Sequence, residues 1–483
     1  MLNKTGLVTV LFVIISFLFL YKLDYLYFFT DEILYIDSGR EHLKGIYDSA
    51  MQVPLLTKYI AGIMYQLADH NVFLLRLPFA IMGIISAVLV YKIIKREFGY
   101  WWGLLGTMLF ASSSIVYSST RMVMLEALMH LSWLSFLYFF YSAIKHNHYK
   151  WFLYSGVTLG FAFASKVTSV ILIPFTLVFF LYHTKTNKLD FKKSVLRYLI
   201  MYTIGFGVFL STYVHTFLKV GGKSTIKLVY NSLINVYFSK SVAGKNHIIN
   251  NKTYTRSPSW TYLYYLYVKE GILRLFTYFV GVISALINKS LFVYYWSMFF
   301  LISLIFHQLS GVKNARYISS FEIPIIILTI AGFYYLSQKL KLIRICFFTV
   351  VILLFVYHSV IAVTQNRTEY NALFENYLKI ETNNYTSNDK IYLYGSTRSS
   401  RWYKHGKGVG KKMFEISKNL DAHCLEFQQY DYIIIEKDEL ARYGNNLLYE
   451  YVTVNHYSFH LIEKYGFLIF KKIHTDPSHN VCK

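Results

Sequence analysis

Long apolar runs alternate with short polar segments along the first three quarters of the chain. Runs of this length with few charges are typical of helices that cross a membrane, because about 20 apolar residues span the hydrocarbon layer. We predict about eleven spans, at residues 6–23, 73–94, 101–117, 123–144, 151–165, 168–182, 198–218, 273–288, 291–308, 321–337 and 343–363. The first run has the basic start and apolar core of a signal peptide but no small-x-small cleavage site, so we interpret it as a retained span.

Polar connectors between the runs differ in charge. Strict alternation from a cytoplasmic N-terminus places five mostly basic connectors inside, as the positive-inside rule requires: residues 92–98, 145–150, 183–197, 288–290 and 337–344. An odd number of spans then puts the C-terminus outside. The pattern predicts a multi-pass protein of the plasma membrane with an extracytoplasmic C-terminal part.

The remaining connectors are predicted to be external: 24–72, 219–272 and 307–322. The tail from 364 contains four segments rich in Ile, Val and Tyr that are typical of strands, at 390–396, 430–437, 449–454 and 467–473. We therefore predict two domains: an all-α membrane domain over 1–363, carrying the external loops 24–72 and 219–272, and a small extracytoplasmic α/β domain over 364–483.

The charge balance is strongly basic, with 49 Lys and Arg against 26 Asp and Glu and a formal net charge of +23. Nucleic acid binding is one reading of such a charge. Because many basic residues cluster between apolar runs, the membrane explains them better and we expect no nucleic acid partner. Of the three Cys, Cys424 and Cys482 lie in the polar tail and could pair if it faces an oxidising compartment. No spacing of Cys and His typical of zinc sites occurs.

Acidic residues are scarce, yet four lie together in the first external connector, FFTDEILYIDSGREHLKG at 28–45. The segment predicts a helix along the membrane surface, in which Asp31 and Glu32 occupy the first turn and suit the helix dipole. At helical spacing Asp31, Tyr35, Ser38 and His42 share one face. Capping explains why acids are tolerated there. A charged residue at the membrane boundary is costly, so a functional role for these acids is the second hypothesis.

The Asp31-Glu32 pair after an apolar first helix resembles the GT-C glycosyltransferases, in particular the branch of protein O-mannosyltransferases and lipid A aminoarabinose transferases. That branch continues with His-Pro-Pro-Leu-x-Lys. The matching stretch VPLLTK keeps Pro54 and Lys58 but has Val53 and Leu55 at the His and second Pro.

Further motifs follow in the family's order. The stretch 74–99 resembles its Arg-Leu-Pro segment, and Arg121 with Glu126 resembles Arg-x-x-x-Leu-Asp. Lys166 lies in a Gly-Leu-Ala-x-x-x-Lys-like turn, and Arg316 with Tyr317 opens an Arg-Tyr-Leu-Leu-Pro-like stretch. The resemblance covers about 6–365 and does not extend to the tail.

The resemblance implies transfer of a sugar from a polyprenyl phosphate to an acceptor hydroxyl, on a protein or a lipid, at the outer face. Asp31 would be the general base, and Glu32 would orient it or bind a metal. The donor phosphate would be held by four cations: Lys58, Arg121, Lys166 and Arg316. Glu126, Tyr35 and Tyr317 would support the site, and we expect Glu126 to pair with Arg121 across a helical turn. No cofactor is required by the resemblance; a divalent metal is left open.

Two alternatives remain. The acceptor could be a lipid or a cell-wall polymer, or the chain could be a transporter of a lipid-linked sugar, which should show ionisable groups near mid-membrane. The charges lie mainly near span ends, which favours the enzyme. His215 and His247 near the second loop are expected to be structural. The basic stretch 406–412 lacks the spacing of a phosphate loop.

Overall fold

The computed structural model describes residues 4–24, 30–47, 53–68, 71–186, 191–230, 258–309 and 315–364, together with six strands. The chain divides into two compact units: Met1–Asp24 with Tyr35–Gln365, and Tyr25–Leu34 with Asn366–Lys483. The division passes through helix α2, whose first turn belongs to the second unit.

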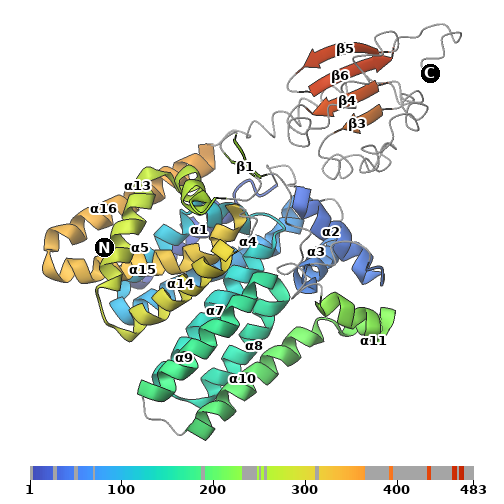
Figure 1. Ribbon diagram of the computed structural model, residues 1–483. Coiled ribbons are helices and arrows are strands. Elements are labelled where there is room, and N and C mark those ends of the chain that lie inside the picture. The colour runs from blue at the N-terminus through green and yellow to red at the C-terminus, as the bar shows by residue number, and fades with distance from the viewer. Residues whose placement is uncertain are drawn as a thin grey trace, which may run out of the picture. The chain divides into compact units, whose positions relative to one another are not determined.

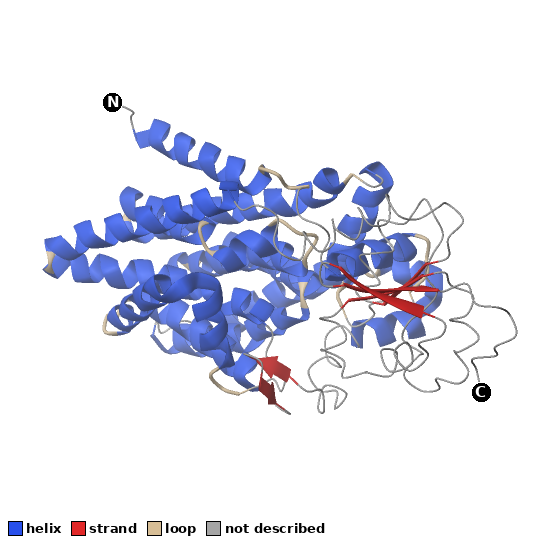
Figure 2. Cartoon of the chain, turned by 90° about the horizontal axis from the view of Figure 1, so that it is seen from above, coloured by secondary structure: helices blue, strands red, loops and turns tan. Residues whose placement is uncertain are grey.

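Helices make up nearly all of the described part of the first unit (Figure 2). Their order along the chain is α1 (Lys4–Leu20), α2 (Thr30–Leu43), α3 (Leu55–Ala68), α4 (Val72–Phe98), α5 (Tyr100–Ala111), α6 (Ser114–Thr120), α7 (Leu125–His146), α8 (Tyr149–Ser165), η1 (Val167–Ile171), α9 (Leu172–Thr186), α10 (Phe191–Ser211), α11 (Val214–Tyr230), α13 (Thr261–Leu286), α14 (Leu291–Leu309), η4 (Ala315–Ile318), α15 (Ser319–Lys339) and α16 (Lys341–Thr364). A short hairpin of β1 (His247–Ile249) and β2 (Lys252–Tyr254) lies between α11 and α13 in sequence.

Helix ends follow local sequence signals. The Asn71 side chain accepts a hydrogen bond from the Leu74 N–H and so caps α4. Gly99 ends the same helix with φ of 89°, in the left-handed region that glycine adopts without strain. Asn147 ends α7 in the αL conformation. Boundaries of this kind are fixed by a few residues, which is why the apolar runs and the helices coincide.

Within the described residues, six helices are long and apolar enough to cross a membrane: α4, α7, α10, α14, α16 and the stretch Arg316–Lys339 that contains α15. Two shorter apolar helical segments, Lys4–Leu20 and Val167–Tyr182, accompany them. Each of the eleven apolar runs overlaps at least one helix. The chain is therefore a multi-span membrane protein built on a helical bundle.

The bundle packs closely where glycines lie between helices. Helix α8 lies beside both α7 and α10 (Figure 1). A Cβ at Gly160 of α8 would lie 2.5 Å from the carbonyl oxygen of Gly205 of α10. Likewise a Cβ at Gly332 of α15 would lie 1.9 Å from the Gly281 oxygen of α13. Close approach at small residues is the usual way in which helices associate in lipid.

The second unit contains a four-stranded sheet in the order β3-β4-β6-β5. Its strands are β3 (Ile391–Tyr394), β4 (Tyr432–Glu436), β5 (Phe459–Lys464) and β6 (Phe467–Lys472). β3 and β4 are parallel, and the other two pairs are antiparallel. Three of the four segments predicted as strands coincide with β3, β4 and β6. The fourth, 449–454, lies outside the described residues.

Candidate functional site

Helix α2 begins with the acidic pair singled out in the sequence. Asp31 and Glu32 lie in its first turn, where carboxylates interact favourably with the helix dipole. Asp31 is partly exposed, whereas Glu32 is fully buried. Farther along the same face Tyr35, Ser38 and His42 are buried, so this face of α2 packs inward.

Helix α2 crosses α3 at two glycines. A Cβ at Gly39 would lie 2.0 Å from the carbonyl oxygen of Lys58, and a Cβ at Gly62 would lie 2.5 Å from the Gly39 carbonyl carbon. Only hydrogen at both positions permits this approach. Lys58 is fully buried, and burial lowers its pKa to about 7. The acidic helix and the helix that carries Lys58 are therefore in direct backbone contact.

Four of the predicted site residues interact at one end of the bundle. The Lys166 ammonium donates to Glu126 Oε1 at 2.7 Å, with both side chains nearly inaccessible. The charge of Arg316 acts on both members of the pair. Lys166 Nζ also lies 5.4 Å from the centre of the Tyr317 ring, within the range of a cation–π contact. The cluster brings together side chains from α7, the α8–η1 junction and η4.

Lys166 ends helix α8 with an extended backbone, φ −152° and ψ 139°, which turns its side chain out of the helix. Burial lowers the pKa of Lys166, and the Glu126 carboxylate opposes that shift. Tyr317 in turn stacks on His307, with ring centres 5.3 Å apart. His307 is fully buried and its ring nitrogens have no hydrogen-bond partner among the described residues.

Arg121 does not pair with Glu126, and the expected contact across a helical turn is wrong. The two residues belong to different helices, because Arg121 ends α6 and Met124 is extended before α7 begins. Arg121 instead donates to the carbonyl oxygens of Tyr21 and Lys22 just beyond α1, and to the Tyr117 hydroxyl. Burial and the nearby Arg76 lower its pKa. These hydrogen bonds tie Arg121 to α6 and to the residues after α1, whereas Lys166 bonds Glu126.

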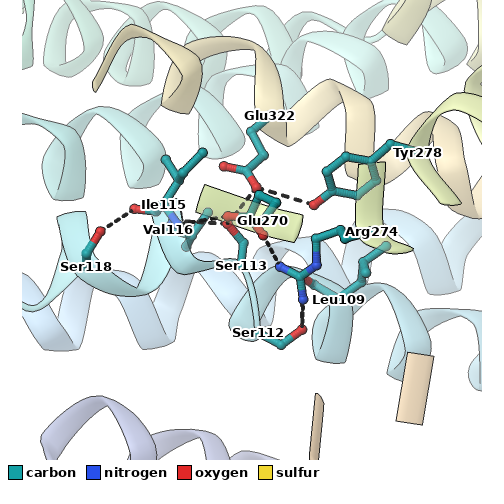
Figure 3. A network of polar contacts seen from close by, with 10 residues as sticks. All are labelled: Leu109, Ser112, Ser113, Ile115, Val116, Ser118, Glu270, Arg274, Tyr278 and Glu322. Atoms are coloured by element: carbon teal, nitrogen blue, oxygen red, sulfur yellow. Dashed lines mark hydrogen bonds and ion pairs between the residues drawn. The ribbon is translucent and has the colours of Figure 1, made fainter. Parts of the chain in front are cut away.

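A second buried polar cluster was not predicted from the sequence. It comprises the ion pair Glu270–Arg274 of α13, Glu322 and Tyr278, and the serines between α5 and α6 (Figure 3). Two signals in the sequence could have indicated it. Glu270 and Arg274 stand four apart on one helix, and Glu322 is a single acid inside an apolar run.

His215 has a structural partner, as expected. Its Nδ1 lies 2.7 Å from the hydroxyl of Tyr47, which lies 3.0 Å from the Tyr59 hydroxyl. These hydrogen bonds connect the α2–α3 region with the start of α11. His247 lies in β1.

An apolar cavity of about 400 Å³ lies between α10 and α11. Its walls include Phe206, Leu210, Phe217 and Ile226. Helix α11 also carries Lys223, which is exposed. A cavity of this kind suits a hydrocarbon chain.

Within the part of the chain that the structure describes, no three His, Cys, Asp or Glu side chains converge as metal ligands. Cys424, Cys482 and the basic stretch 406–412 lie outside the described residues.

Comparison with known proteins shows one family match and similar solved structures. The dolichyl-phosphate-mannose-protein mannosyltransferase family matches residues 52–215. No curated protein matches the sequence. Among solved structures, ArnT from Cupriavidus metallidurans bound to undecaprenyl phosphate is similar over 98% of this chain and 99% of its own, at 11% identity and a TM-score of 0.63.

A second similar structure is the archaeal oligosaccharyltransferase AglB from Archaeoglobus fulgidus, in complex with an inhibitory peptide and a dolichol-phosphate. The likeness covers 98% of this chain and 75% of AglB, at 14% identity and a TM-score of 0.57. At such low identity the two structures establish the fold, and the family match agrees with it. The fold and the family match over residues 52–215 agree with the resemblance to the GT-C glycosyltransferases seen in the sequence.

Proposed function

We propose that this protein transfers a sugar, of the hexosyl or mannosyl type, from a polyprenyl-phosphate donor to an acceptor hydroxyl on the outer face of the membrane. The observation that carries the proposal is the buried cluster in which Lys166, Glu126 and Arg316 interact at one end of the bundle. A fold shared over nearly the whole chain with a protein bound to undecaprenyl phosphate supports it.

In the proposed reaction Asp31 takes the proton of the acceptor hydroxyl as its oxygen attacks the anomeric carbon. The bond from that carbon to the phosphate oxygen breaks, and the phosphate leaves on its lipid. A phosphate is already a good leaving group, so one carboxylate suffices and no general acid is needed. The partial exposure of Asp31 allows an acceptor to reach it.

The departing phosphate gains negative charge, which nearby cations stabilise. We assign this role first to Lys58, Lys166 and Arg316. Lys166 donates to Glu126, so the donor phosphate would compete with that carboxylate for the ammonium. Arg121 already bonds two carbonyl oxygens, and its role would be to fix the chain beyond α1 beside the donor.

The cavity between α10 and α11 is a suitable place for part of the lipid chain. Its volume of about 400 Å³ and its apolar walls fit several prenyl units. The exposed Lys223 on α11 would face an anionic headgroup region.

Finer parts of the proposal come from the sequence. We propose eleven spans, a cytoplasmic N-terminus, an extracytoplasmic α/β domain after residue 363 and a protein acceptor. A lipid or cell-wall polymer is the alternative acceptor. Glu32, Tyr35 and Tyr317 are proposed as supporting residues, with Glu32 orienting Asp31.

Transport of a lipid-linked sugar is the rival function. Transporters place ionisable groups near mid-membrane between interrupted helices. Here Glu126 and Glu322 lie in the first turns of their helices, and Lys166 lies just beyond the end of α8. Charges at helix ends favour chemistry at the membrane surface.

The test is reconstitution of the purified chain in vesicles with a short-chain polyprenyl-phosphate sugar and a hydroxyl acceptor. The proposal expects a new glycoside and free polyprenyl phosphate, both absent with Asp31→Asn. Movement of the lipid-linked sugar between leaflets without any glycoside would overturn it.

A further inference from the structure

The cluster between α5–α6, α13 and α15 contains two carboxyl groups that meet at one hydroxyl. Ser113 Oγ lies 3.2 Å from Glu270 Oε1 and 2.6 Å from Glu322 Oε1 (Figure 3). The same oxygen accepts a hydrogen bond from the Val116 N–H at 3.1 Å, because Ser113 caps α6. Three groups therefore share one serine oxygen.

A hydroxyl has one hydrogen and two lone pairs. The Val116 N–H occupies one lone pair, which leaves the Ser113 oxygen one hydrogen to give and one lone pair to fill. Two ionised carboxylates would both need that hydrogen. One of the two oxygen–oxygen contacts would then have no proton between its atoms. The count is satisfied only if one carboxyl group brings its own proton.

The partners of each carboxyl group identify which one. Glu270 Oε2 accepts from Arg274 at 2.5 Å, and its Oε1 accepts from the Ile115 N–H at 3.0 Å. A carboxylate that binds a guanidinium and a backbone N–H is ionised. Glu322 has no cation partner of this kind, and its Oε2 has no hydrogen-bond partner among the described residues.

Charge leads to the same conclusion. The side chains of Arg274 and Glu270 are 3% and 1% exposed, and Glu322 is fully buried. The ion pair is already neutral, so a second carboxylate would be a net buried charge, which costs several kcal/mol. Protonation removes that cost. The polar groups that face Glu322 are Ser113, Glu270, Arg274 and Tyr278, and His358 of α16 is within electrostatic reach of Arg274.

We propose that Glu322 is held as a neutral carboxylic acid, that its Oε1–H donates to Ser113, and that it acts as a positioning residue for the catalytic end of the bundle. Ser113 donates onward to Glu270, and the Tyr278 hydroxyl donates to Glu322. The chain of bonds ties the start of α6 to α13 and α15.

The position of this chain of bonds gives it a role. Helix α15 follows directly from η4, which carries Arg316 and Tyr317, and α6 ends at Arg121. Helix α6 and η4 are in contact. A neutral Glu322 thus sets how the Arg316 end of the site lies relative to the Arg121 end, without touching the donor. This role, unlike the protonation itself, rests on the proposed function.

Protonation is tested on the full-length chain in detergent. The infrared spectrum of the wild type at neutral pH should contain the C=O band of a protonated acid, and Glu322→Gln should remove it. Glu322→Gln should melt close to the wild type, because an amide replaces the acid group for group. The matched variant Glu270→Gln should melt well below it, because Arg274 loses its counterion. No acid band in the wild type, a band that persists in Glu322→Gln, or equal losses in the two variants would overturn the proposal.

Positioning is tested by rescue, with a short-chain polyprenyl phosphate as the probe. Glu322→Ala should weaken its binding on the order of tenfold to a hundredfold, as small displacements of binding groups do. Glu322→Gln should bind the short-chain polyprenyl phosphate as tightly as the wild type. Binding by Glu322→Gln as weak as that of Glu322→Ala would refute the positioning role. A wild type that binds no polyprenyl phosphate would refute the proposed function and with it this role, while the infrared result would still decide the protonation.

Discussion

Replacing Glu126 by Gln distinguishes the effect of the buried Lys166–Glu126 pair on the stability of the fold from its effect on phosphate binding. At 2.7 Å the attraction between Lys166 and Glu126 is about 6 kcal/mol for an effective dielectric constant of about 20. Desolvation of the two charges offsets most of it, so the intact pair adds little to stability. Removing one partner is different, because the other charge stays buried, and this costs about 3–5 kcal/mol. We expect Glu126→Gln to destabilise the fold by that amount.

The same substitution should strengthen phosphate binding. In the wild type the donor competes with Glu126 for the Lys166 ammonium, and in Glu126→Gln that competitor is gone. We expect a short-chain polyprenyl phosphate to raise the melting temperature of Glu126→Gln more than that of the wild type. Lys166→Met is the matched control and should lose this ligand effect. Melting would be followed by intrinsic fluorescence in detergent, with and without ligand.

A pH series tests the electrostatic explanation, because that explanation predicts the direction in which the stability deficit of Glu126→Gln changes with pH. Burial already lowers the pKa of Lys166, and loss of the carboxylate lowers it further. Between that folded-state pKa and the value of an unfolded lysine, the unfolded chain binds more protons, so stability rises with pH. The deficit of Glu126→Gln should therefore shrink as the pH rises through that interval. A variant as stable as the wild type, or one that binds the phosphate more weakly, would refute the reasoning.

Three further predictions follow from single residues. Asp31→Asn should abolish transfer and retain donor binding, whereas Asp37→Asn, at a half-exposed position of the same helix, should leave both intact; full transfer by Asp31→Asn would exclude it as the base. Because the pKa of Lys58 is about 7, its ammonium is lost as the pH rises past 7, so phosphate affinity should fall by up to about tenfold per pH unit. Lys58→Arg should flatten that profile in the same titration, and an unchanged slope would remove Lys58 from the phosphate site. Gly39→Ala should destabilise the fold by about 1–3 kcal/mol or more through overpacking, measured by thermal melting, while Gly207→Ala, with open space around it, should be neutral or stabilising by up to about 1 kcal/mol.

The helical part of the fold was predictable because its signals are local. A run of apolar residues and a capping Asn71 or Gly99 suffice to locate α4. In the second unit β5 escaped prediction, since FHLIEK carries His460 among its apolar residues and is less apolar than FLIFKK of β6. Its place in the sheet depends on pairing with β6. The strand propensity of single residues does not predict such pairing.

The residues of the candidate site were proposed from the sequence, but the contacts between them could not be predicted from it. Glu126 pairs with Lys166, 40 positions away, and no periodicity relates them. The break between α6 and α7 contains no Gly or Pro that would indicate it in the sequence. The spacing of Arg121 and Glu126 therefore predicted that they share one helical turn. The meeting of Glu322 with Ser113, 209 residues earlier, likewise depends on how whole helices pack.

The hydrogen bond between Tyr47 and His215 has a consequence for the order in which the protein is made. These residues are 168 positions apart, which corresponds to about 8–35 s of synthesis at the usual rate of 5–20 residues per second. During that interval α2 and α3 have emerged while α11 has not. The hydrogen bond of Tyr47 to His215 can therefore form only after α4 to α10 have been synthesised, and docking of the α2–α3 region against α11 is a late step of assembly.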